Sequence, residues 1–253
     1  MKSLSSSIVA TIAILVFSQS AFSQGLVFNG GATLTTAYGA GADTYLSNDT
    51  NSGPSVVHGG AASMNMRAID NSRARLILLR FDLSELEAST LTDATLTLNL
   101  TTSTRTRDWN VFGSSDATLN AWDELSTNYN NAPGINSATL GNYSIDTAVW
   151  ASLGTFNIQA SIGQQTSNTT SLNLDSLLTG NTSGFASLLL AFPSGTSSDP
   201  DWWVTSKEGD AMLAPTLNLP NAQAIPEPST YAVIFGGLAF MGVVYLRRRN
   251  RKA

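Results

Sequence analysis

Hydrophobic and polar residues alternate along several short stretches between residues 24 and 222. Residues 95–101 alternate strictly, with Leu at every second position and Thr or Asn between. This period of two predicts a strand with one buried side and one solvent-facing side. Residues 216–219 repeat the pattern, whereas residues 76–81 and 187–192 are nearly continuous apolar runs. Such runs predict strands that are covered on both faces.

Clusters of Gly, Pro, Asn, Asp and Ser separate these stretches, and no long segment has a helical period. Residues 170–178 hold four leucines in a mixed pattern and predict at most one short helix. The predicted fold is therefore all-β: an antiparallel, jelly-roll-like β-sandwich formed by residues 24–222. Shorter strands are expected at residues 44–47, 110–112 and 153–158.

The N-terminal end differs from this domain. Residues 1–23 begin with Lys2 near the start, continue through an apolar stretch at residues 8–17, and end with the small residues Ala21 and Ser23. This order is typical of a secretory signal peptide, and signal peptidase is expected to cleave after Ser23.

The C-terminal end combines a proline-rich linker (residues 223–230), an apolar run (residues 231–246) and a basic tail (residues 247–253). The apolar run would measure about 24 Å as a helix. That is short for a hydrocarbon core of about 30 Å, but a bilayer that thins locally accommodates it as a single transmembrane helix. Because cytoplasmic flanks are rich in Lys and Arg, Arg247, Arg248 and Arg249 place the tail in the cytoplasm and the domain outside.

This arrangement resembles a PEP-CTERM sorting signal, since a Pro-Glu-Pro element, a short apolar helix and an arginine cluster follow one another at the C-terminus. The resemblance implies a Gram-negative bacterium, transient anchoring in the inner membrane with the domain in the periplasm, and a final place at the cell surface or in an extracellular matrix. It also implies an exosortase that cuts the tail away. An ordinary membrane anchor with a proline hinge is the alternative. The residues expected to be recognised are Pro226, Glu227, Pro228, Ser229 and Thr230.

Charge and composition narrow the function of the exported part. Six of the 13 Lys and Arg residues lie in the first 23 or last 29 residues, as does one of the 18 acids. The remaining seven bases and 17 acids carry a net charge near −10, which argues against nucleic-acid binding. The chain has no Cys and a single His, His58, which is expected to be a solvated loop residue. The lack of Cys excludes thiol chemistry, and a single His excludes a histidine zinc site. A Ser-His-Asp triad is disfavoured, because it would have to be built on this one His.

A second resemblance covers the domain. Four stretches carry it: Ala42–Leu46, the strand that begins at Arg75, Trp122-Asp123-Glu124 and Ser206-Lys207-Glu208. Together they are similar to the DNRLRE-type domain, a jelly-roll sandwich akin to carbohydrate-binding modules. Tyr129 stands where that family often has Trp. The resemblance implies a binding or surface role, and it implies that Trp122 belongs to the core.

Sugar binding by such a domain would use exposed aromatic rings, because a ring face packs against the apolar face of a sugar. Successive residues of a strand point to opposite faces, so one of the adjacent tryptophans at 202 and 203 is expected in the core and the other outside. Core packing is the alternative for each tryptophan. The carbohydrate candidates are Trp109, Trp150, Trp202 and Trp203.

Calcium is the metal that an acidic, cysteine-free exported domain suits best, because carboxylate and carbonyl oxygens at turns are its ligands. Asp43 and Asp49 lie in and just after the first expected strand. Jelly-roll carbohydrate modules hold a structural calcium where the first and last strands meet, and this resemblance implies that Glu208 lies near Asp43. Solvated turn residues are the alternative for all three acids.

The function expected from these observations is non-catalytic. The protein is predicted to bind or organise extracellular polysaccharide in a biofilm or floc. A structural or adhesive scaffold without a sugar site is the first alternative. A polysaccharide-degrading enzyme is the second, because a glycosidase needs two carboxylates about 5 to 9.5 Å apart, and Asp123, Glu124, Asp199 and Asp201 are available.

Overall fold

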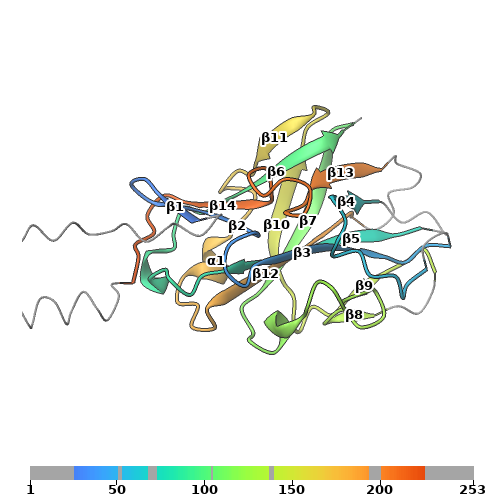
Figure 1. The fold of residues 1–253 in the computed structure, drawn as a ribbon, viewed down its shortest axis with the longest axis horizontal. Coiled ribbons are helices and arrows are strands. Elements are labelled where there is room, and N and C mark those ends of the chain that lie inside the picture. The colour runs from blue at the N-terminus through green and yellow to red at the C-terminus, as the bar shows by residue number, and fades with distance from the viewer. Residues whose placement is uncertain are drawn as a thin grey trace, which may run out of the picture.

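The computed structural model describes residues 26–50, 53–67, 73–103, 105–136, 140–193 and 201–225, which form two antiparallel β-sheets packed as a sandwich (Figure 1). The signal peptide expected at residues 1–23, the Pro-Glu-Pro element and residues 231–253 lie outside these described residues. Among the residues that are described, no helix has the length and apolar character needed to cross a membrane.

One sheet has seven strands. Its strand order is β1-β2-β14-β6-β13-β4, and β11 pairs separately with β6. The strands are β1 (Leu26–Phe28), β2 (Ala32–Thr35), β4 (Ser63–Met66), β6 (Thr95–Thr102), β11 (Gly163–Thr166), β13 (Trp202–Thr205) and β14 (Thr216–Leu219). The first and last strands of the described chain, β1 and β14, therefore lie in the same sheet, and β14 pairs with β6 from the middle of the chain.

The other sheet has five strands in the order β10-β7-β12-β5-β3. These are β3 (Ala42–Ser47), β5 (Arg75–Asp82), β7 (Arg107–Ser114), β10 (Ala151–Ile158) and β12 (Phe185–Ala191). A small hairpin joins β8 (Ile135–Asn136) to β9 (Ser144–Ile145). The helices described are short: η1 (Ala88–Thr90), η2 (Leu119–Ala121) and α1 (Asp175–Leu178).

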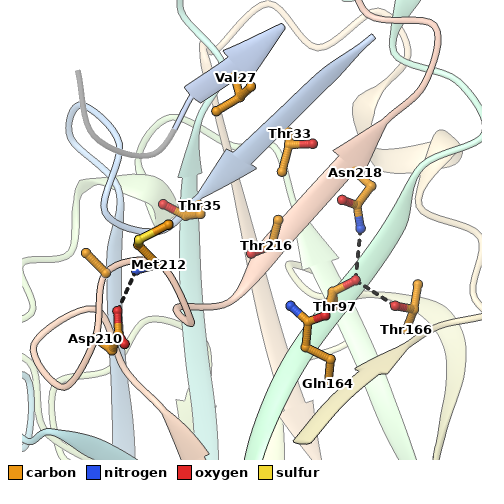
Figure 2. Close-up of a pocket in the computed structure, with 11 residues that line it drawn as sticks. Val27, Thr33, Thr35, Thr97, Gln164, Thr166, Asp210, Met212, Thr216 and Asn218 are labelled. Atoms are coloured by element: carbon orange, nitrogen blue, oxygen red, sulfur yellow. Dashed lines mark hydrogen bonds between the residues drawn. The ribbon is translucent and has the colours of Figure 1, made fainter. Parts of the chain in front are cut away.

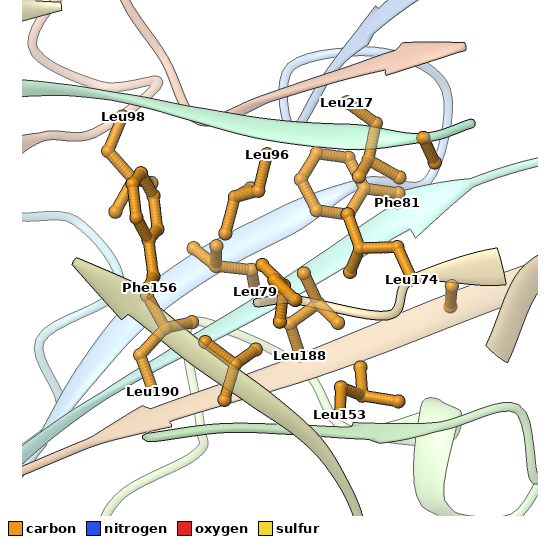
Figure 3. Close-up of a cluster of buried hydrophobic side chains, with 14 of the residues drawn as sticks. Leu79, Phe81, Leu96, Leu98, Leu153, Phe156, Leu174, Leu188, Leu190 and Leu217 are labelled. Carbon is orange, nitrogen blue, oxygen red and sulfur yellow. The ribbon is translucent and has the colours of Figure 1, made fainter. Parts of the chain in front are cut away.

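The main hydrophobic core fills the space between the two sheets (Figure 3). The alternation of β6 sends Leu96, Leu98 and Leu100 into it, each fully buried, against Leu79 and Leu188 of the opposite sheet. Burial of a leucine side chain contributes about 1.5–3 kcal/mol relative to exposure. These inward leucines hold the intervening Thr and Asn residues on the outer side of the seven-stranded sheet.

A second core explains why β5 and β12 are nearly continuous apolar runs. Leu76, Leu78 and Leu189 point to the far side of the five-stranded sheet, where the segment between β7 and β10 covers them with Trp122, Tyr129 and Trp150 among others. Both faces of β5 and β12 are therefore buried, as the sequence predicts. The predicted core position of Trp122 is confirmed, since it is 7 % exposed.

The strands predicted from periodicity are all present. Residues 216–219 match β14, and residues 95–101 match β6 to within one residue. The strands predicted at 44–47, 110–112 and 153–158 are the longer strands β3, β7 and β10, and the helix predicted within 170–178 is the single turn α1.

Leu98→Ala tests whether the inward leucines of β6 support the sandwich. Removing this fully buried side chain leaves a cavity between the sheets and is expected to lower the free energy of unfolding by about 2–5 kcal/mol in urea titrations. The matched control is Leu125→Ala, because Leu125 is 68 % exposed, and its cost is expected to stay within about 0.5 kcal/mol. Equal costs for the two variants would contradict this packing.

Candidate functional site

Threonine and asparagine side chains form rows across the outer side of the seven-stranded sheet. In one row the strand register pairs Thr33 with Asn218 and Asn218 with Thr95. In the next row the register pairs residues of β2, β14, β6 and β11 in turn, and its members are Thr35, Thr216, Thr97 and Thr166. The rows exist because leucines occupy the alternate, inward positions of these strands.

A groove of about 720 Å³ lies over these rows (Figure 2). Its floor is hydrogen-bonded: Asn218 Nδ2 donates to Thr97 Oγ1 at 2.9 Å, and the hydroxyls of Thr97 and Thr166 lie 2.8 Å apart. Its lining includes two large apolar side chains, Val27 of β1, 57 % exposed, and Met212, 88 % exposed. The groove residues are Val27, Thr33, Thr35, Thr97, Gln164, Thr166, Asp210, Ala211, Met212, Thr216 and Asn218.

The groove is rich in groups that both donate and accept hydrogen bonds. Hydroxyls and side-chain amides do both, so this surface complements a ligand that carries many hydroxyls. The charged residue in the lining is Asp210, whose Oδ1 accepts a hydrogen bond from the backbone N–H of Met212 at 2.9 Å. Among the described residues that line the groove, none has an aromatic ring.

Three of the four tryptophans proposed from the sequence as sugar-stacking residues are corrected by the structure. Trp109 and Trp202 are fully buried between the sheets around Phe192, with ring centroids 6.0 and 4.9 Å from it. Trp150 is fully buried in the second core, where its Nε1–H donates to the carbonyl of Pro133 at 2.8 Å. Their ring faces pack against the protein, so none of the three presents a surface to a sugar.

Trp203 is the partly exposed member of the adjacent pair, as the alternation of strand side chains predicts. It contacts the ring of Tyr45 edge-on at 6.5 Å. Tyr45 in turn stacks on His58 at 3.9 Å, so His58 is half-buried rather than the solvated loop residue expected. Burial, followed by the nearby Arg75, lowers the pKa of His58.

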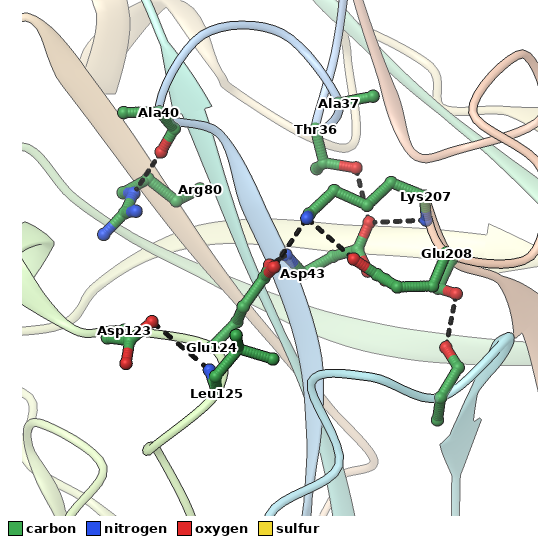
Figure 4. A network of polar contacts seen from close by, with 12 residues as sticks. Thr36, Ala37, Ala40, Asp43, Arg80, Asp123, Glu124, Leu125, Lys207 and Glu208 are labelled. Carbon is green, nitrogen blue, oxygen red and sulfur yellow. Dashed lines mark hydrogen bonds and ion pairs between the residues drawn. The ribbon is translucent and has the colours of Figure 1, made fainter.

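Asp43 and Glu208 do come together, at the end of the sandwich where β3 meets the segment after β13 (Figure 4). Asp43 Oδ2 accepts hydrogen bonds from Thr36 Oγ1 at 2.5 Å and from the backbone N–H of Lys207 at 3.1 Å. The Lys207 ammonium lies between Glu124, at 2.5 Å, and Glu208, at 2.7 Å. The Lys207 ammonium thus pairs with Glu208, one of the acids expected to hold a cation, and the backbone N–H of Lys207 donates to Asp43, another.

Burial dominates the electrostatics of this cluster. It raises the pKa of Asp43 to about 7, against the opposing hydrogen bond from Thr36, and the negative charge of Glu208 adds to the rise. Burial also raises the pKa of Glu124, although Lys207 opposes this. For Lys207, burial alone would lower the pKa, but hydrogen bonds to Glu124 and Glu208 raise it above its ordinary value.

The donor set does not fit the calcium expected at Asp43, Asp49 and Glu208. Asp49 is fully buried and its Oδ2 accepts from Arg75 Nε at 2.8 Å and Nη2 at 2.7 Å. Asp43 and Glu208 already contact Lys207. Within the described part of the chain, no three His, Cys, Asp or Glu side chains are grouped so that they could hold a metal ion.

The groove residues were not among the candidates proposed from the sequence. A signal for them is present, because three strands repeat a polar-Leu-polar triplet: residues 33–35, 95–97 and 216–218. The alternation predicts the outward Thr and Asn of two of these strands, but recognition was expected at aromatic rings instead.

Two family profiles match the chain. Residues 34–206 match carbohydrate-binding module family 96, and residues 224–249 match the PEP-CTERM protein-sorting motif. No curated protein matches the chain. The first match spans the stretch from β2 to the residue before Lys207, and the second confirms the sorting signal proposed from the sequence.

Asp43→Asn tests the buried carboxyl. Because the folded pKa of Asp43, about 7, exceeds its ordinary value of 3.8, the folded state binds more protons than the unfolded state between these limits, and this side chain costs stability as pH rises through that range. The variant is therefore expected to gain stability relative to wild type from about pH 4 to pH 7, measured by urea unfolding at each pH. The control Asp108→Asn, at an exposed carboxyl, should show no such gain, and a pH-independent difference for Asp43→Asn would contradict the assignment.

Proposed function

We propose that this chain, which belongs to carbohydrate-binding module family 96, binds polysaccharide in the groove on the outer side of its seven-stranded sheet. The observation that carries the proposal is the pair of in-register rows of Thr and Asn side chains from β2, β14, β6 and β11. The jelly-roll form of the sandwich, expected from the sequence, is part of the same proposal.

The chemistry of the groove supports a ligand with many hydroxyls. Each hydrogen bond exchanged with water contributes only about 0.5–1.5 kcal/mol, so affinity must come from several contacts in line, which the rows provide. Val27 and Met212 offer apolar atoms at the same surface, where the C–H groups of a sugar ring pack. A sugar polymer presents hydroxyls and C–H groups repeatedly, as the groove does.

Catalysis is not supported by this surface. Hydrolysis of a glycosidic bond needs two carboxyl groups, one on each side of the bond, and the described residues of the groove lining include one acid, Asp210. Glu124, one of the acids considered from the sequence, is engaged by Lys207 at 2.5 Å. Asp201, another, contacts Arg67 at 2.5 Å. A binding module is the function that this geometry favours.

The sorting motif supplies the destination in this proposal. Proteins with a PEP-CTERM motif are exported and sorted to the cell surface, so an exosortase and signal peptidase are the expected processing partners and the inner membrane a transient anchor. The released or surface-attached domain would then bind extracellular polysaccharide and contribute to a biofilm or floc. A net charge near −10 on the exported part agrees with a role that involves no nucleic acid.

A double variant, Thr33→Val with Gln164→Met, tests the groove. Both side chains are exposed and line it, and their removal is expected to weaken polysaccharide binding about tenfold by loss of two polar contacts. Affinity electrophoresis of the purified full chain, after a glycan array has identified the polymer, provides the measurement.

The matched control for this experiment is Thr101→Val with Gln223→Met, which makes the same chemical changes at exposed residues outside the groove. Its affinity is expected to stay within about twofold of wild type. An array on which the folded chain binds no glycan would contradict the proposal and favour the structural or adhesive scaffold.

Glu227→Ala tests the sorting signal. Glu227 is the charge between the two prolines of the Pro-Glu-Pro element, so its removal is expected to leave the full chain uncut in the membrane fraction. Intact-mass measurement of membrane-bound and released protein reads this out, with Glu87→Ala as a control that is processed normally. Released wild-type protein that still ends in the arginine tail would contradict processing by an exosortase.

A further inference from the structure

Residues 223–225 lie antiparallel to residues 85–87, in the loop that follows β5. Two backbone hydrogen bonds of 2.9 Å join the two segments. The N–H of Glu87 donates to the carbonyl of Gln223, and the N–H of Ile225 donates to the carbonyl of residue 85. Residues 223–225 thus form an exit strap, a short segment by which the chain is tied to the domain just before it leaves.

The exit strap lies at one end of the sandwich, at the left of Figure 1 on the side of β1. The backbone N–H of Gln223 donates to Thr90 Oγ1 at 3.0 Å, and Asn221 Nδ2 donates to Asp93 Oδ2 at 2.8 Å. The chain is therefore held against the loop between β5 and β6 up to its last described residue. This loop and residues 221–225 are the exit end of the domain.

The tether that follows the exit strap is short. The match to the sorting motif begins within the strap, at residue 224, and five residues, 226–230, separate Ile225 from the apolar run expected in the membrane. A fully extended chain of this length reaches at most about 20 Å. By comparison, the eight residues of β6, which begins at the exit end, span about 27 Å. The tether is therefore shorter than the sandwich.

Attraction to lipid does not explain why the exit end would lie near a bilayer. Its exposed charged residues are Glu85, Glu87 and Asp93, and its described residues include no Lys or Arg. Anionic headgroups attract basic segments, so this end has no electrostatic affinity for them. The short tether is what would hold the exit end close to the membrane.

We infer that, while the chain is anchored, the exit strap and its tether hold the exit end of the sandwich toward the membrane, and that the opposite end, at the β10–β11 turn, points away. This inference rests on the proposed function, because it assumes that the sorting motif anchors the chain. It goes beyond that function in naming the surface of the domain that faces the membrane and the sorting enzyme. The enzyme then reaches the chain in a gap no wider than the tether.

Fluorophores at the two ends of the sandwich test the inference in the uncut full chain. The chain has no Cys, so Ser89→Cys labels the exit end alone and Ser161→Cys labels the opposite end alone. Both serines are exposed. The labelled chains are reconstituted in vesicles of phosphatidylethanolamine and phosphatidylglycerol that contain lipids with spin-labelled headgroups. We expect the fluorophore at residue 89 to be quenched several-fold more strongly, because quenching requires close approach to the headgroups.

A longer tether separates its effect from any other cause of proximity. A Gly-Ser segment of about eight residues, inserted between Ile225 and Pro226, adds about 28 Å of reach. The insertion leaves the exit strap and the Pro-Glu-Pro element unchanged. Quenching at residue 89 is expected to fall toward the value at residue 161. Quenching that stays as strong as in the wild-type tether would overturn the tether as the cause.

Hydrogen exchange tests the exit strap itself. Glu87→Pro removes the N–H that donates to Gln223, and the φ of −75° at this residue suits proline. The matched control Glu87→Ala keeps the N–H. The amide of Ile225 is expected to exchange about tenfold faster in the Pro variant, by loss of the neighbouring hydrogen bond, and at the wild-type rate in the Ala variant. A wild-type Ile225 amide that exchanges as fast as in an unfolded chain would overturn the strap.

The outcomes distinguish this inference from the proposed function. Equal quenching at residues 89 and 161 would overturn the orientation and leave the sorting signal in place. A folded full chain that enters neither the membrane fraction of cells nor the vesicles would overturn the anchoring, and with it the destination given in the proposed function.

Discussion

The inward packing of alternate leucines is the constraint on which the binding face depends. In β2, β14 and β6 the residues between the outward Thr and Asn are Leu34, Leu217 and Leu96, and all three are at most 1 % exposed. A shift of one residue in any of these strands would place leucine outside and hydroxyls in the core. The same burial that stabilises the sandwich therefore orders the polar rows, and no separate device is needed to hold them in place.

The two sheets have different roles, because only the five-stranded sheet has further chain packed against its outer side in addition to the core on its inner side. The five-stranded sheet is covered on its outer side by the segment that contains Trp122, Tyr129 and Trp150, so β5 and β12 are apolar on both faces. The outer side of the seven-stranded sheet carries the groove instead. The large aromatic residues thus build cores, while the recognition surface consists of small polar side chains that are already fixed by hydrogen bonds to one another.

Much of the fold follows from periodicity, and much of the site does not. The alternation at β6 and β14 and the apolar runs of β5 and β12 are local patterns, which is why these strands were predicted closely. The groove depends on which strands become neighbours: Thr33, Asn218 and Thr166 are far apart in the chain and meet only through pairing in the sheet. Local patterns contain no information on that pairing. The tryptophans were misassigned for a related reason, since composition marks an aromatic ring as useful for sugars but cannot place it inside a core.

Local sequence patterns also could not predict all the contacts of the acids Asp43, Glu124 and Glu208. Their proximity was expected in part, but the lysine between them was not, because Lys207 is adjacent to Glu208 in the chain and only the fold brings it to Glu124. An internal cation thus stands where a metal was expected, at the end of the sandwich. The groove lies on the sheet itself, and binding there needs no contribution from this cluster.

The most direct measurement of the central claim is a map of amide chemical-shift changes in the isotope-labelled protein as a bound oligosaccharide is titrated. The account predicts that the largest changes fall on β2, β14, β6 and β11, with the side-chain amides of Gln164 and Asn218 among them. Changes concentrated around Trp203, Tyr45 and His58, with the groove unaffected, would contradict it.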